Sequence, residues 1–108
     1  MRVTVAVAVV LRAFLDDPAE QRYGYDLMKQ TGFGSGKLYP ILDRLEKAGW
    51  LERSHENADP AVLGRPARVH YRLTGVGTRA ATLELAALND RLRRPQRRSV
   101  RLFPGWSA

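Results

Sequence analysis

The chain has 108 residues, a formal net charge of +7 at pH 7 and no cysteine. Its length fits one domain, and its apolar and charged fractions, 44% and 27%, are those of an ordinary globular protein. The absence of cysteine excludes disulfides, cysteine-ligated metals and cysteine nucleophiles, and it is compatible with a reducing cytoplasm.

The positive charge is concentrated near the C-terminus. Residues 90–108 carry six arginines and one acidic residue, which leaves 12 basic and 10 acidic residues, a net +2, for positions 1–89. We expect 95–108 to be a basic tail that is either disordered or docked through Phe103 and Trp106. Such a tail suits a polyanionic partner, but by itself it is weak evidence for nucleic acid.

The N-terminal apolar run, residues 3–11, is too short for a membrane span, which needs about 20 apolar residues. No small-residue cleavage site follows at the distance that a signal peptide requires. We therefore expect 5–17 to be a buried first helix, although the Val-Ala alternation also suits a strand. A loop over 16–22 should follow, because Asp-Pro stops a helix, and no membrane partner is expected.

Two further helices are predicted. The segment 23–32 should form a short helix with Gly32 as its C-terminal cap. After a glycine-rich turn, Ser35 is expected to cap a third helix that runs to Ala48 and ends at Gly49. Its apolar residues recur at spacings of three and four, as one buried face requires: Leu38, Ile41, Leu42, Leu45 and Ala48.

Pro40 lies inside this third helix. A proline in a helix interior removes an amide donor and costs about 3 kcal/mol. If the helix begins at Ser35 or Gly36, Pro40 stands at the edge of the first turn, where few amides have partners within the helix. We therefore expect a much smaller cost and at most a slight kink.

A β-hairpin is predicted next, because residues 50–56 and 67–73 both alternate between apolar and polar residues. In the second segment, Val69, Tyr71 and Leu73 should face the core. The residues between the two segments include Asn, Asp, Gly and two prolines, which indicates a long loop. Trp50, at the start of the hairpin, is expected to be a core or hinge residue.

The last predicted element is a long helix from Thr74 to Arg94, stopped by Pro95. It carries two apolar stripes, so one could pack on its own domain and the other on a second subunit. The stripe with coiled-coil spacing is the predicted dimerisation face: Ala81, Leu85, Leu88 and Leu92. The neighbouring stripe contains Val76, Ala80, Leu83 and Ala87.

The order of elements predicts the fold. Three helices, a hairpin and a final helix indicate an α+β, mainly α protein: a winged helix-turn-helix domain over 1–73, a dimerisation helix over 74–94 and a tail over 95–108. In such a domain the third helix enters the major groove of double-stranded DNA, and the wing lies along the backbone or minor groove.

The third helix supplies most of the candidate DNA contacts. Its N-terminus offers a hydroxyl and a lysine for phosphates and base edges, and Arg44 could pair with guanine or a phosphate. The candidates are Ser35, Gly36, Lys37, Tyr39, Pro40 and Arg44. An ordinary solvated face is the alternative, since Asp43, Glu46 and Lys47 lie there too.

In the wing, Arg65 and Arg68 are predicted to contact DNA, because arginine suits the negative potential of a narrow minor groove. The alternative is that Arg68 and Arg72 pair with Glu52 or Glu56 across the hairpin.

No catalytic, cofactor or metal site is expected. The "GFGSG" stretch follows no strand, no Gly-Lys-Ser/Thr sequence follows it at the spacing of a phosphate-binding loop, and Ser35 has no base nearby. The two histidines have no third ligand grouped with them, whereas zinc sites need three or four protein ligands.

Three motifs in the right order resemble the PadR family of transcriptional regulators: "GYDL" (24–27), "LYPILDRLEKAG" (38–49) and "YRLTGVG" (71–77). The resemblance implies a bacterial, cytoplasmic homodimer that binds a palindromic operator, usually as a repressor. It also places Tyr25 in the DNA-binding unit and matches 74–94 to the family's dimerisation helix.

The chain departs from that pattern in its long wing, its arginine-rich tail and the absence of tryptophan from the terminal helix. Some small relatives bind flat aromatic compounds between such tryptophans, so the effector, if there is one, is unknown. The alternative function is a winged-helix module that binds another protein and has no specific DNA recognition.

Overall fold

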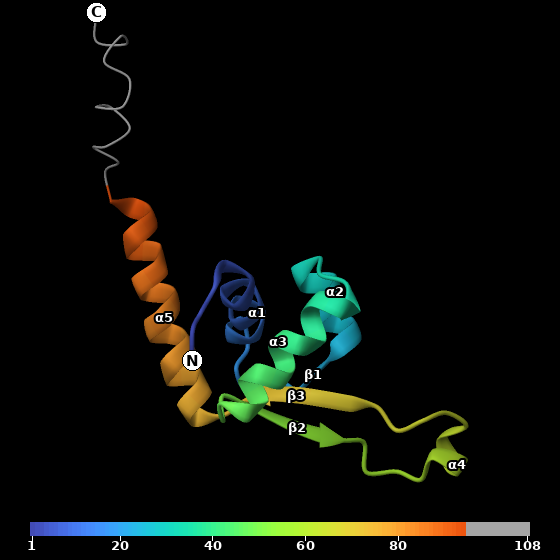
Figure 1. The fold of residues 1–108 in the computed structure, drawn as a ribbon. Coiled ribbons are helices and arrows are strands. Elements are labelled where there is room, and N and C mark those ends of the chain that lie inside the picture. The colour runs from blue at the N-terminus through green and yellow to red at the C-terminus, as the bar shows by residue number, and fades with distance from the viewer. Residues whose placement is uncertain (95–108) are drawn as a thin grey trace, which may run out of the picture.

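Three helices pack on one another and on a small antiparallel sheet (Figure 1). The structure, a computed structural model, describes residues 1–94, so the predictions for the tail 95–108 lie outside the described residues. The helices of the body are α1 (Val5–Leu15), α2 (Gly24–Thr31) and α3 (Ser35–Lys47). A hairpin of β2 (Leu51–His55) and β3 (Val69–Leu73) follows, and α5 (Gly75–Arg93) leads away from it.

A third strand, β1 (Arg22–Tyr23), pairs antiparallel with β3, so that the sheet order is β1-β3-β2. The sequence predicted a loop up to residue 22 because a two-residue strand is too short to show alternation. β1 joins the sheet to α2: the buried Arg22 donates a hydrogen bond from Nη1 to the Gln30 side chain at 3.1 Å. The predicted two-stranded wing is therefore part of a three-stranded sheet.

The core lies between the three helices and the inner face of the hairpin. Phe14, Leu27 and Leu42 have no exposed surface, and Tyr71 and Leu73 line the sheet side. The predicted buried face of α3 is confirmed from Leu38 to Leu45, whereas Ala48 is exposed at the helix end. Alternation therefore placed Tyr71 and Leu73 correctly, whereas Val69 is only partly buried and His70, predicted to face outward, is buried.

The start of α3 differs from the prediction by one residue. Gly34 is the N-cap and Ser35 is the first helical residue, so the Ser35 side chain does not cap the helix. Pro40 is therefore the sixth residue and lies inside the helix rather than at the edge of its first turn. Its missing N–H would normally bond the carbonyl of Gly36, which lies on the exposed surface.

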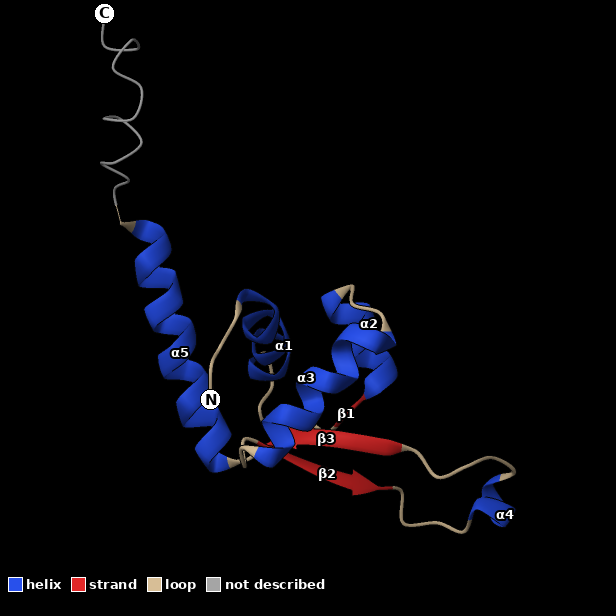
Figure 2. Cartoon of the chain, in the orientation of Figure 1, coloured by secondary structure: helices blue, strands red, loops and turns tan. Residues whose placement is uncertain are grey.

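Thr74 connects the hairpin to α5. Its hydroxyl accepts a hydrogen bond from Gly77 N at 2.9 Å, which caps the helix, and donates to the carbonyl of Gly49 at 2.7 Å. Its amide donates to the carbonyl of Trp50 at 3.0 Å. Trp50 also packs against the core, as predicted. These contacts fix the direction in which α5 leaves the sheet (Figure 2).

α5 packs on its own domain over its first half and extends beyond it (Figure 1). Ala81 is fully buried in the core of its own chain, and Leu85 packs against that core. The assignment of Ala81 to a dimerisation face was therefore wrong, because the first turns of the helix are needed to cover the domain itself. Leu83 and Leu92, farther along, are each 72% exposed.

The wing extends from the opposite side of the body to α5 (Figures 1 and 2). Its connection was predicted to be a loop, but it contains one helical turn, α4 (Pro60–Leu63), at the tip. The Asp59 side chain caps this turn by accepting from Ala61 N at 3.0 Å, and Gly64 ends it with φ +67°.

Candidate nucleic-acid interface

The face of α3 opposite the core is exposed and carries positive charge. Tyr39 is 43% exposed, and Lys37 and Arg44 have no acidic partner within the part of the chain that the structure describes. Asp43, which argued for a mixed face, pairs with Lys47 at 2.9 Å. The hydrogen bond and charge of Asp43 raise the pKa of Lys47. Asp43 is therefore neutralised within the helix, whereas Glu46 forms no ion pair in the described part of the chain.

The Lys37 side chain is held in position by an aromatic ring. Its Nζ lies 4.3 Å from the centre of the Phe33 ring, in the turn before α3. This cation–π contact restricts the side chain but leaves its three N–H donors available.

The N-terminus of α2 adds a second exposed aromatic residue. Tyr25 is 62% exposed, and Lys29 Nζ lies 4.6 Å from the centre of its ring. Next to it, Gly24 is buried against the hydroxyl end of Tyr39 of α3. Residues of the first two sequence motifs therefore meet in space.

A hollow of about 370 Å³ opens where α2, α3 and the hairpin meet. It brings together three predicted site residues, Tyr25, Tyr39 and Arg68, with Arg53 of β2. Sequence reasoning did not select Arg53. The signal was present in the alternation of "LERSH", which places Arg53 on the same face as the buried Leu51.

Tyr71 forms part of this hollow and is paired with Arg53 in the β2–β3 register. Burial raises the pKa of the Tyr71 hydroxyl, while the positive charge of Arg53 acts in the opposite direction. Like other tyrosine hydroxyls, the Tyr71 hydroxyl is a neutral hydrogen-bond donor at physiological pH, and its burial acts in the same direction.

Most wing arginines are already paired with acids. Arg65 Nη2 donates to both carboxylate oxygens of Glu56 at 3.1 Å, and Arg68 Nε lies 3.8 Å from the same carboxylate. Arg72 pairs with Glu52 at 2.9 Å, which confirms the alternative of a cross-hairpin pair for that residue. The ion pair between Arg65 and Glu56 therefore connects the two sides of the wing at its base.

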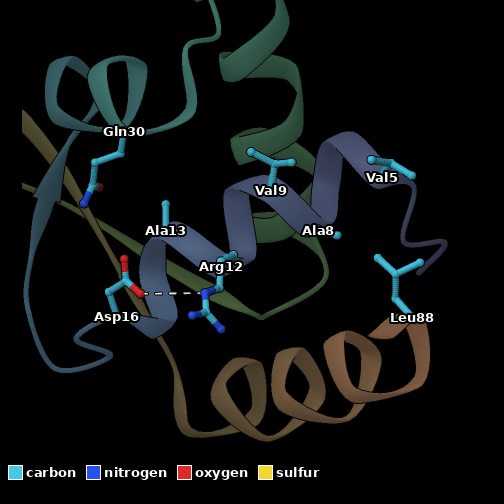
Figure 3. Close-up of a pocket in the computed structure, with 8 residues that line it drawn as sticks. All are labelled: Val5, Ala8, Val9, Arg12, Ala13, Asp16, Gln30 and Leu88. Atoms are coloured by element: carbon cyan, nitrogen blue, oxygen red, sulfur yellow. Dashed lines mark ion pairs between the residues drawn. The ribbon is translucent and has the colours of Figure 1, made fainter. Parts of the chain in front are cut away.

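A second feature lies on the other side of the body, between α1 and α5 (Figure 3). A hollow of about 410 Å³ there is lined by Val5 and Val9 of α1 and by Leu88 of α5, which points toward Val5. A second hollow, of about 460 Å³, continues along α5 to Leu92. We call these two hollows together the α1–α5 groove, and its lining is mostly apolar.

Within residues 1–94, no group of three His, Cys, Asp or Glu side chains could hold a metal ion. In the same residues, no helix is long and apolar enough to cross a bilayer.

Three helices, the third of which exposes Lys37, Tyr39 and Arg44 on one face, and a hairpin wing that follows them define a winged helix-turn-helix DNA-binding protein. The chain belongs to the transcriptional regulator PadR-like family, whose model matches residues 13–83. It is thus a DNA-binding transcriptional regulator, and members of this family are regulators rather than enzymes.

Solved structures agree with this assignment. The chain is similar to smu.1704 from Streptococcus mutans UA159, with 25% identity, 82% of each chain covered and a TM-score of 0.63. A padr family transcriptional regulator from Eggerthella lenta DSM 2243 has 26% identity and a TM-score of 0.62, with 79% of this chain and 76% of that one covered. AbfR of Staphylococcus epidermidis shares the fold at 20% identity, with a TM-score of 0.66 and coverage of 87% and 57%. A comparison with curated proteins gave no match.

Proposed function

We propose that this protein is a homodimeric, cytoplasmic repressor that binds a palindromic operator. The α3 helix of each subunit enters the major groove of one half-site, and each wing lies along the flanking backbone. The winged helix-turn-helix domain, 1–73, then binds DNA, and α5, within 74–94, forms the contact with the second subunit.

The observation that carries this proposal is the exposed face of α3. Lys37 and Arg44 extend from it without acidic partners in the described chain, while Asp43 is neutralised by Lys47. A helix with free cations and an exposed aromatic residue suits base edges and phosphates. A docking surface for an ordinary protein partner does not need unpaired cations, so DNA is the better match.

The basis for the homodimer is the α1–α5 groove. In one chain Val5 is 70% exposed and Leu92 is 72% exposed, and both line this groove. A second copy of α5 offers the same apolar residues in return, as a twofold interface requires. Of the predicted dimerisation residues, Leu85, Leu88 and Leu92 therefore stay in the proposal and Ala81 does not.

The test is selection of DNA sequences from a random pool with the purified protein, followed by footprinting on the selected duplex. A symmetric footprint with two half-sites about one helical turn apart is expected. Binding that shows no preference over random DNA would reject specific recognition and favour the protein-interaction module. A reporter gene behind the selected site should be repressed when the protein is present.

A further inference from the structure

The hollow between α2, α3 and the hairpin is lined by basic and aromatic residues from several elements. Arginine and tyrosine side chains from four elements converge on it: Arg53 from β2, Arg68 from the segment before β3, Tyr39 from α3 and Tyr25 from α2. Such a set is rich in hydrogen-bond donors and positive charge, and the hollow has no acidic residue in its lining. A ligand with negatively charged oxygens suits it.

Arg53 is the unusual member of this set. It lies opposite Tyr71 and on the same face of the sheet as Leu51, so its side chain leaves the strand on the helix side of the sheet, where it is exposed and lines the hollow. Within residues 1–94 it has no acidic partner, whereas the other hairpin arginines pair with Glu52 or Glu56. A guanidinium on the inner face without a carboxylate has its hydrogen-bond donors free for a ligand.

The aromatic residues hold the hollow in shape. The hydroxyl end of Tyr39 rests on Gly24, and the Arg68 guanidinium lies 5.6 Å from the centre of the Tyr23 ring. Lys29 Nζ lies 4.6 Å from the centre of the Tyr25 ring and adds a positive charge next to the lining. Tyr39 and Arg68 are therefore held by contacts with neighbouring residues, and the exposed Arg53 lies beside them in the lining.

We propose that this hollow binds one backbone phosphate of the DNA duplex, with Arg53 as its central charge and the Tyr39 hydroxyl as a second donor. This inference rests on the proposed DNA-binding function and adds a residue and a contact to it. Arginine binds phosphate oxygens in a bidentate geometry, and tyrosine hydroxyls are common phosphate donors. Since Tyr39 belongs to α3, the phosphate lies beside the base pairs that α3 contacts and sets the register of the helix in the groove.

The test compares Arg53→Gln with Arg72→Gln, a control that removes the same charge from the outer face of the same hairpin. Binding of each variant to the selected duplex and to a random duplex is measured as a function of salt. For Arg53→Gln we expect about tenfold weaker binding to both duplexes. The slope of log K against log[salt] should become shallower by about 0.9 for each phosphate that the variant no longer neutralises. Arg72→Gln should leave the slope near that of the wild type, and Arg53→Lys should keep the slope while reducing the affinity in part.

The outcomes separate this inference from the proposed function. An unchanged slope for Arg53→Gln, in a protein whose circular dichroism and melting temperature are preserved, overturns the phosphate site. A shallower slope in a protein that does not prefer the selected duplex supports the site and rejects specific operator binding. Failure of the wild type to bind either duplex rejects both. Saturable binding of inorganic phosphate that Arg53→Gln abolishes, together with an unchanged salt slope for DNA binding, would assign the hollow to a free anion and overturn the DNA assignment.

Discussion

Gly24 and Tyr39 are in direct contact, so close that a Cβ on Gly24 would overlap the phenol ring of Tyr39. The contact joins the start of α2 to the exposed face of α3. It explains why the "GYDL" and "LYP" motifs occur together: the first provides a position without a side chain, and the second places a ring on it. The position of Tyr39 on the proposed DNA-binding face therefore depends on the buried Gly24 of the neighbouring helix.

Gly24→Ala should displace Tyr39 and weaken DNA binding at a modest cost in stability, because the overlapping atoms are at the far end of a side chain. We expect a decrease in affinity of about tenfold, measured by fluorescence anisotropy, with a loss of about 1–2 kcal/mol in urea unfolding. Gly75→Ala is the control, since a Cβ there makes only ordinary contact with Arg79. Equal affinities for Gly24→Ala and the wild type would contradict the dependence of DNA binding on this contact.

Gly77 is a second glycine in close contact, but its neighbour is backbone rather than a side chain. A Cβ at this position would overlap the backbone carbonyl of Trp50, which also accepts the Thr74 amide. Backbone cannot move aside as a side chain can, so Gly77→Ala should cost about 3 kcal/mol or more and lower the melting temperature by more than about 10 °C. Gly75→Ala, two residues earlier in the same helix, should melt close to the wild type. A melting temperature unchanged in both variants would show that α5 can shift on the hairpin without cost.

Local sequence patterns predicted most of the fold. The inner residues of α3 and β3, the Gly32 cap and the Thr74 start of α5 follow from spacing and from capping chemistry that acts over a few residues. β1 was not predictable in this way, because its pairing with β3 joins residues about fifty positions apart and its own two residues carry no pattern. Ala81 shows the same limit: its spacing fits a dimer seam, but only the packing of α5 on α1 decides that it is internal.

The candidate site was predictable residue by residue but not as an arrangement. Lys37, Tyr39 and Arg44 follow from the period of α3, and the structure places them on its exposed face. The use of Arg65 to bind Glu56 depends on how the long wing folds back, which no local pattern specifies. Arg53 was missed because an arginine in a strand is ordinary until the strand is placed beside α2 and α3.

The wing arginines should separate by role when they are replaced one at a time. Arg65→Ala leaves the half-buried Glu56 without its bidentate partner, so we expect a destabilisation of about 1 kcal/mol, measured by thermal unfolding. Arg68→Ala breaks a longer contact of 3.8 Å and should barely change stability while it weakens binding to DNA of any sequence. The opposite order, with Arg68→Ala the less stable and Arg65→Ala the weaker binder, would reverse these roles.

Replacement of Leu92 tests the proposed homodimer. Leu92→Glu should convert the protein to a monomer in sedimentation velocity at micromolar concentration, because it places a charge in the apolar α1–α5 groove. Val62→Glu is the matched control: Val62 is 83% exposed at the wing tip, away from that groove, and the variant should stay dimeric. A wild-type protein that sediments as a monomer would reject the dimer, and a dimeric Leu92→Glu variant would locate the interface elsewhere.

Pro40 disfavours the helix in which it lies, because it has no amide N–H to donate within α3. Pro40→Ala restores an amide that can bond the Gly36 carbonyl and removes the clash of the ring with that turn. We expect the free energy of unfolding to rise by about 1–2 kcal/mol, less than the full interior cost because alanine also makes the unfolded chain more flexible. DNA affinity should fall at the same time, since the exposed ring beside Tyr39 can contact a thymine methyl group or a sugar. Urea unfolding and anisotropy on the selected duplex measure the two effects. A variant that is both less stable and unchanged in binding would show that the proline is kept for the helix itself and not for its exposed face.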